Sequence, residues 1–232
     1  MSTHQLSALN ELASRLEKTI DGNQAPQCVK IQNQHRRLTE ALRGLHSLAT
    51  TPSPMDSTGA HLLKVQKASQ RLRDEVEKVR DESRQLVASR KRDLEDSLKV
   101  LAGIKPNEYA PEIRSRFANL SQSEKLDVLQ SIIDSRDGAS FAAIVGAPPF
   151  LTGLEPSLRD RLTDNFYEKV SPDFYGARNA MNDVADLMDS TVRLVDRAAT
   201  GYTDPALTAK IEKDAIEANQ AAEAFAKAFS EF

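Results

Sequence analysis

The sequence predicts an all-α protein with a helical hairpin, a long coiled-coil-like arm, a small helical middle domain and a C-terminal helix pair. Three observations support this class. Apolar residues recur at steps of three and four, strand-like alternation is almost missing, and the 232 residues include only 9 glycines and 5% aromatics. A hydrophobic content of 40% is too high for general disorder, and no apolar run is long enough to span a membrane.

The first 50 residues predict two helices joined by a short turn. Five apolar residues share one face from Thr3 to Ile20: Leu6, Leu9, Leu12, Leu16 and Ile20. Asp21-Gly22-Asn23 then ends the helix, and Pro26 begins a second that runs to about Ala49. Its two seven-spaced rows are Ile31, Leu38, Leu45 and Cys28, His35, Leu42, Ala49. The short connection favours an antiparallel hairpin.

The next segment predicts a single long helix. Pro52 and Pro54 end the second helix, and no proline or glycine occurs from Ala60 to Ala102. Charged side chains make up 19 of the 36 residues from 64 to 99. Only a thin apolar seam remains: Leu62, Val65, Leu72, Val76, Val79, Leu86, Leu94, Leu98 and Leu101. We interpret this as an arm with a solvated face, whose seam needs helices from its own C-terminal pair or from another subunit. The spacing of eight from Leu86 to Leu94 indicates a slip in the heptad.

The remainder predicts short helices over 111–118, 122–135 and 156–170, followed by two longer ones. Ser121-Gln122-Ser123-Glu124 is a capping box, and Ser171-Pro172-Asp173 and Asp204-Pro205 are strong helix starts. The first long helix carries two seven-spaced rows: Phe174, Met181, Met188, Val195 and Ala177, Val184, Thr191, Ala198. The second long helix also carries two: Ile211, Ala218, Phe225, Phe232 and Ala215, Ala222, Phe229. The expected segments are 1–105, 106–171 and 172–232, the last an antiparallel pair packing on the arm or on a neighbouring subunit.

Charge and cysteine content exclude several classes. The net charge of −3 is not that of a dedicated nucleic-acid binder, and one cysteine builds neither a disulfide framework nor a cysteine-based zinc site. The start of the chain does not resemble a signal peptide, which predicts a cytoplasmic protein and a free thiol at Cys28. Cys28 lies on an apolar row of the second helix, so we expect this thiol to be buried. The charge is uneven: residues 1–105 carry a net +5 and residues 106–232 a net −8, an asymmetry that steers association.

The residues contain no recognisable catalytic or cofactor-binding signature. A P-loop, a dinucleotide fingerprint, HExxH, an EF-hand loop and GxSxG are all missing from the sequence. His35 and His46 would lie roughly 16 Å apart along one helix, too far to share a metal ion. No Glu-x-x-His occurs, and the acids alternate with Lys and Arg as on a solvated face. We therefore expect no enzyme, cofactor or metal site.

Three groups of residues are candidate binding surfaces. The apolar stretch 141–154 presents Phe141, Ile144, Val145, Pro148, Pro149, Phe150, Leu151 and Leu154, either as core or as a partner-docking loop. Phe225, Phe229 and Phe232 form a stripe that is either core or a helix for a partner's groove. Arg84, Arg90, Lys91 and Arg92 form a basic patch, diluted by the acids that follow it, for phosphate or nucleic acid.

One stretch carries a family resemblance. Residues 137–154, Asp137-Gly138-Ala139-Ser140 followed by the apolar segment to Leu154, resemble a segment of uncharacterised structural proteins of tailed phages and prophages. The resemblance implies a virion or assembly role, such as scaffolding, core or ejection protein, and transfers no functional residues. Scaffolding proteins of this type often end in a basic helix. The last helix here, from Asp204, departs from that pattern because it has 3 Lys against 6 Asp and Glu.

Together these observations predict a non-catalytic structural or assembly protein acting through helical self-association and apolar docking, as a homo-oligomer or in a larger assembly. The alternative is a regulatory adaptor that binds a protein partner, or nucleic acid through the basic patch. An enzyme and a curved, membrane-sculpting dimer are less favoured than either.

Overall fold

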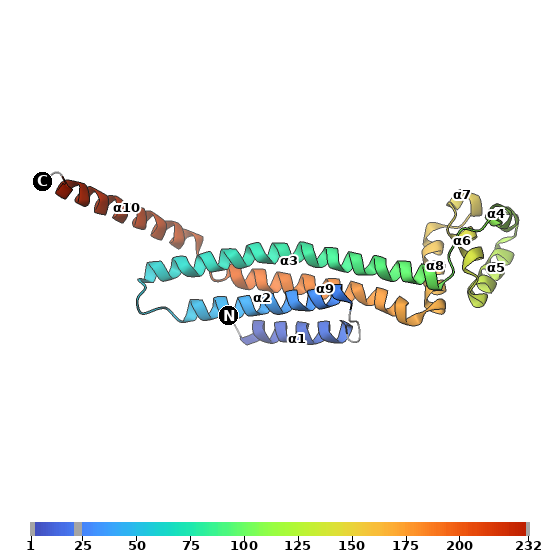
Figure 1. Cartoon of the computed structure of the whole chain (residues 1–232), viewed down its shortest axis with the longest axis horizontal. Helices are drawn as coiled ribbons and strands as arrows, with labels where there is room; N and C mark the ends of the chain where they lie inside the picture. The colour runs from blue at the N-terminus through green and yellow to red at the C-terminus, as the bar shows by residue number, and fades with distance from the viewer. Residues whose placement is uncertain (1–2, 21–24, 231–232) are drawn as a thin grey trace. The chain divides into compact units, whose positions relative to one another are not determined.

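A computed structural model describes residues 3–20 and 25–230, and it confirms the all-α class (Figure 1). Within those ranges the chain forms ten helices and no strand. They are α1 (Thr3–Ile20), α2 (Pro26–Thr50), α3 (Thr58–Leu101), α4 (Ala110–Ala118), α5 (Gln122–Ser135), α6 (Gly138–Val145), α7 (Pro149–Thr152), α8 (Pro156–Val170), α9 (Pro172–Thr200) and α10 (Pro205–Ser230). None of the described helices combines the length and the apolarity needed to cross a membrane.

Local signals explain why the helix ends agree with the sequence. The Ser121 hydroxyl accepts a hydrogen bond from the Glu124 amide, and the Glu124 carboxylate accepts one from the Ser121 amide at 2.8 Å, which completes the predicted capping box. Proline occupies the first turn of α2 and α8, where its missing N–H costs no hydrogen bond. Helix starts of this kind depend on neighbouring residues alone.

The chain divides into two compact units, which are described separately. The first comprises Met1–Leu86 and Val184–Phe232, and the second comprises Val87–Asp183. This division differs from the expected segments 1–105, 106–171 and 172–232. The reason is that α3 and α9 each contribute residues to both units, so neither helix belongs to one segment.

In the first unit α1 packs on α2, and α2 packs on the beginning of α3. Arg43 donates to the Asn10 side chain between α1 and α2 at 2.9 Å. Between α2 and α3, Arg37 and Glu75 form an ion pair at 2.8 Å. The buried side chains of α2 are Cys28, Ile31, His35, Leu38, Thr39, Leu42 and Leu45, which include both predicted rows apart from Ala49. The burial of Cys28 confirms its predicted place in the core.

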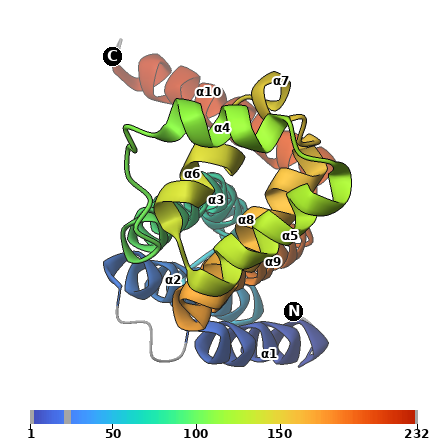
Figure 2. The same cartoon turned by 90° about the vertical axis from the view of Figure 1, so that its right-hand side faces the viewer.

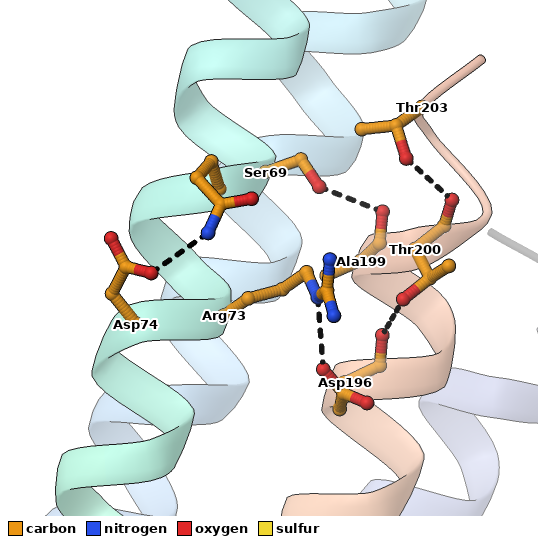
Figure 3. A network of polar contacts seen from close by, with 8 residues as sticks. Ser69, Arg73, Asp74, Asp196, Ala199, Thr200 and Thr203 are labelled. Carbon is orange, nitrogen blue, oxygen red and sulfur yellow. Dashed lines mark hydrogen bonds and ion pairs between the residues drawn. The ribbon is translucent and has the colours of Figure 1, made fainter. Parts of the chain in front are cut away.

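The predicted seam of α3 is covered in this unit by the end of α9. Ser69 is fully buried, and its hydroxyl donates to the Ala199 carbonyl at 2.9 Å (Figure 3). One turn further along α3, Arg73 forms an ion pair with Asp196 at 3.2 Å. A small residue at position 69 allows close approach of the two backbones, while Val65, Leu72, Val76 and Val79 fill the seam around it.

The second unit encloses a core between its short helices, with α4, α5, α6 and α8 gathered around it (Figure 2). The Phe141 and Phe166 rings stack at its centre, with centroids 4.1 Å apart and planes 8° apart. The core residues are Leu98, Ala102, Phe117, Leu129, Ile132, Ile133, Phe141, Ile144, Val145, Leu154, Phe166 and Tyr167. Val87 is also buried and restores a seven-residue spacing to Leu94, whereas Leu101 is 53% exposed and does not belong to the seam.

Gly138 lets the start of α6 lie directly against the end of α3. A Cβ atom at position 138 would lie 1.7 Å from the Ala102 carbonyl oxygen and 2.7 Å from its carbon. Both are backbone atoms, so no side-chain rotation relieves the overlap. Glycine is therefore required here by the close approach of two chain segments.

We expect Gly138→Ala to lower the free energy of unfolding of the second unit by about 2–4 kcal/mol, because the backbone must move to admit the methyl group. Thermal and urea unfolding followed by circular dichroism measure the change.

Gly176→Ala is the matched control in the same unit. A Cβ at position 176 meets no atom within 4 Å, so this exposed helical position should gain about 0.5–1 kcal/mol from the same substitution. Equal effects at the two positions would contradict the close-packing explanation.

Candidate docking surfaces

The apolar stretch 141–154 divides into a buried half and an exposed half. Four of its side chains lie in the core and are not available for docking: Phe141, Ile144, Val145 and Leu154. The other four, Pro148, Pro149, Phe150 and Leu151, are exposed, with Phe150 83% and Leu151 40% accessible. We call residues 148–151 the apolar tip.

Backbone chemistry separates the two halves. Pro149 begins the single turn of α7, and Gly153 ends it with a φ of +68°, a conformation that glycine adopts without strain. The turn is too short to bury its own apolar side chains. The apolar tip is consequently the part of the stretch whose apolar side chains are exposed.

Helix α10 presents an apolar face that the rest of the chain leaves mostly uncovered. At 100° per residue, its members fall within about 80° of one another: Leu207, Ile211, Ala215, Ala218, Ala222 and Phe225. Leu207 is 42% exposed, Phe225 is 67% exposed and the three alanines are exposed, while Ile211 is half-buried near Gly59. We call these six residues the α10 face.

The predicted packing of the last helix on the arm is thus seen only at Ile211. Every other α10 side chain that the structure describes, from Ala206 to Lys227, is exposed. Phe225 is therefore not a core residue. The side chain of Phe229 and the whole of Phe232 lie outside the described part of the chain.

A shallow apolar groove of about 350 Å³ lies between α2 and α3 in the first unit. Its lining residues are Arg37, Ala41, Gly44, Leu45, Leu48, Ala68, Arg71, Leu72 and Glu75. A Cβ atom at Gly44 would meet nothing within 4 Å, so the groove is open to solvent at this point. We call this feature the α2–α3 groove. Sequence analysis missed it, although the small residues Ala41 and Gly44, three positions apart, were a usable signal.

The basic patch is largely engaged by neighbouring side chains. In the first unit, the Arg84 guanidinium lies 3.3 Å from the Asp189 carboxylate. In the second unit, Lys91 donates to the Asn182 side chain at 2.9 Å, Arg92 donates to the Ala88 carbonyl at 3.4 Å, and Arg90 is half-buried. Arg84 and Lys91 therefore contact residues of α9, whereas Arg92 contacts the backbone of its own helix.

A polar cleft of about 300 Å³ lies between α1 and α2, and His35 forms part of its wall. This imidazole is only 4% exposed, and its Nε2 atom has no hydrogen-bond partner among the described residues. Burial lowers the pKa of His35, against a smaller raising effect of the Glu17 carboxylate. His35 therefore belongs to the core as a neutral side chain. The described residues include no group of three or more His, Cys, Asp or Glu able to hold a metal ion.

The stability of the protein should fall as the pH drops below about 6.5. Because burial lowers the pKa of His35 in the folded state, the unfolded chain takes up a proton first, and this favours unfolding. His35→Leu should remove this part of the pH dependence, measured as urea-unfolding free energies between about pH 7.5 and pH 5.

Thr39→Val is the control for that experiment. Thr39 is buried one turn from His35 and its hydroxyl donates to the His35 carbonyl, yet it does not titrate. Its pH profile should therefore run parallel to that of the wild type. A His35→Leu profile that keeps the wild-type slope would show that His35 is not the titrating group.

Phe141→Ala and Phe150→Ala should separate the buried half of the apolar stretch from the apolar tip. Loss of the stacked Phe141 ring leaves a cavity and should cost about 3–5 kcal/mol. Loss of the exposed Phe150 ring should change the unfolding free energy by about 0.5 kcal/mol or less. Comparable losses in a circular dichroism melt would place Phe150 in the core.

Comparisons with known proteins do not supply a function for this arrangement. No protein-family model, curated protein or solved structure matches the chain. The functional argument consequently depends on the surfaces described above.

Proposed function

We propose that the chain is a non-catalytic assembly protein that associates with copies of itself through the α10 face. The observation that carries this proposal is the exposure of an apolar face over five turns of one helix, from Leu207 to Phe225. Exposed apolar patches on proteins usually mark interaction sites. A helix whose apolar positions repeat at this spacing packs most readily against other helices.

The composition of α10 also supports association. Alanine is the best helix former, so the segment adopts a helix at little cost. An isolated helix of this length is nonetheless marginal in water, and packing normally supplies most of its stability. Full burial of a leucine, isoleucine or phenylalanine side chain contributes about 1.5–3 kcal/mol, and Leu207, Ile211 and Phe225 would each gain the part of it that corresponds to their exposed area. Since association itself costs several kcal/mol, we expect a moderate affinity for each contact.

The apolar tip gives the assembly a second point of contact. Phe150 and Leu151 are exposed apolar residues within the stretch that resembles tailed-phage structural proteins. That resemblance supports a phage virion or assembly component as the biological setting. Helical self-association and apolar docking are the properties that such a component requires.

An adaptor role through nucleic acid has less support. Arg84 is paired with Asp189, and Lys91 is bound to Asn182. A surface that binds nucleic acid offers its cations to phosphates, and its affinity falls steeply with added salt. We therefore do not propose nucleic acid as the partner.

Equilibrium sedimentation across the micromolar range tests self-association. The wild type should form oligomers, and Ala218→Glu should weaken association at least tenfold, because it places a charge at the centre of the α10 face. A wild-type protein that remains monomeric throughout this range would refute the proposal.

Gln220→Glu is the matched control. Residue 220 lies opposite the α10 face on the same helix and is exposed, like Ala218. The substitution adds the same charge, so its oligomers should be as stable as those of the wild type. Equal weakening by both variants would indicate a general effect of charge and not a specific face.

A further inference from the structure

We infer that α10 of one copy docks in the α2–α3 groove of a second copy. This inference rests on the proposed self-association and names its second surface. The contact joins two different surfaces, so each copy presents its helix to one neighbour and its groove to another. Both surfaces lie in the first unit.

The two surfaces match in the size of their side chains. The groove has small residues at Ala41, Gly44 and Ala68, so no large side chain fills it at these positions. The middle of the α10 face is likewise small, with Ala215, Ala218 and Ala222. Small residues on both helices allow the backbones to approach closely, and interaxial distance depends on the side chains at the contact.

They also match in length and in the placing of large residues. The α2 wall from Arg37 to Leu48 covers roughly 16 Å, and α10 from Ala215 to Phe225 covers roughly 15 Å. Leu45, Leu48 and Leu72 line the groove as apolar partners for larger side chains. An aromatic side chain such as Phe225 is a common anchor in a groove of this kind.

Charge favours the same pairing. Arg37 and Arg71 both line the groove. Arg37 is paired with Glu75, which lines the groove as well, whereas Arg71 makes no ion pair or hydrogen bond with any residue that the structure describes. On α10, Asp214 lies beside the alanines, whereas Glu217 lies further round the helix and is paired with Lys213. In the docked arrangement Asp214 of the helix would meet Arg71 of the groove, in keeping with the net +5 of residues 1–105 and net −8 of residues 106–232.

The occupant of the groove comes from another copy because α10 does not fill the groove of its own chain. Leu45 and Leu72 are buried within their own chain, but Ala41 and Gly44 are exposed. The described side chains of α10 beyond Ile211 are exposed too. A helix lying in the groove of its own chain would bury both sets. A contact between two different surfaces also propagates, giving rings or open chains in place of a closed dimer.

Single-cysteine crosslinking tests the inference. In a Cys28→Ser background, one protein carries Gly44→Cys, where a Cβ has open space, and the other carries Ala218→Cys. On mixing and mild oxidation we expect a disulfide between positions 44 and 218, because the bond forms only when the Cα atoms come within about 4.4–6.8 Å. Denaturing gels without reductant and peptide mass spectrometry identify the pair. Gln220→Cys with Gly44→Cys is the control and should give little product.

A second readout uses charge. Arg71→Glu should weaken association about three- to tenfold in equilibrium sedimentation, and Asp214→Arg in the same chain should restore most of the loss. Arg71 is exposed, so its replacement leaves the fold intact, which circular dichroism verifies.

The outcomes separate this inference from the proposed function. Oligomers that crosslink 218 to 218 and not 44 to 218 would overturn groove docking while leaving self-association in place. A 44–218 disulfide that forms within monomers of a double-cysteine chain, and not between mixed chains, would show that the helix folds onto its own groove and would also overturn it. A protein that stays monomeric and forms no crosslink would refute both proposals.

Discussion

The burial of the thin apolar seam of α3 is the constraint on which the rest of the structure depends. This helix has 44 residues, and charged side chains occupy most of its surface. Only one narrow line along it can be removed from water, so its partners must fit that line closely. In the first unit, the buried hydroxyl of Ser69 is satisfied by the Ala199 carbonyl, which removes the cost of a buried polar group. In the second unit, Leu98 and Ala102 carry the same helix into the core of the short helices.

The boundaries of eight of the ten described helices followed from the sequence because their causes are local, whereas α6 and α7 within the apolar stretch were not predicted. Ser121, Pro172 and Asp204 each predict a helix start, because capping depends only on residues within three positions along the chain. The structure has a helix start at or directly after each of them. The burial of single residues did not follow, because it depends on segments far apart in the chain. Phe141 and Phe150 are both aromatic residues in one apolar stretch, yet one stacks in the core and the other is exposed. Only the position of Phe166, 25 residues after Phe141, distinguishes them.

Candidate sites were harder to predict than elements for the same reason. The α2–α3 groove exists because alanine and glycine have small side chains or none at these positions. Hydrophobic periodicity detects large apolar residues and passes over such positions. Val87 was missed because Leu86 beside it satisfied the pattern equally well, and only packing selects between adjacent residues. The basic residues cluster in the sequence, but what Arg84 and Lys91 contact depends on Asp189 and Asn182, which are about 100 residues away in the chain.

The contact between Gly138 and the Ala102 carbonyl also bears on how such chains diverge. Surface helices tolerate replacement of most side chains, so exposed charged positions on α3 and α10 other than Arg71 and Asp214 would be expected to drift rapidly among descendants of a common ancestor. Position 138 has no such freedom, because every other amino acid brings a Cβ atom into the backbone 36 residues earlier. Among related chains, we expect this glycine to be retained after the sequences of the flanking helices have diverged. A glycine at this position would then identify a related chain more reliably than the pattern of charged residues on the helices.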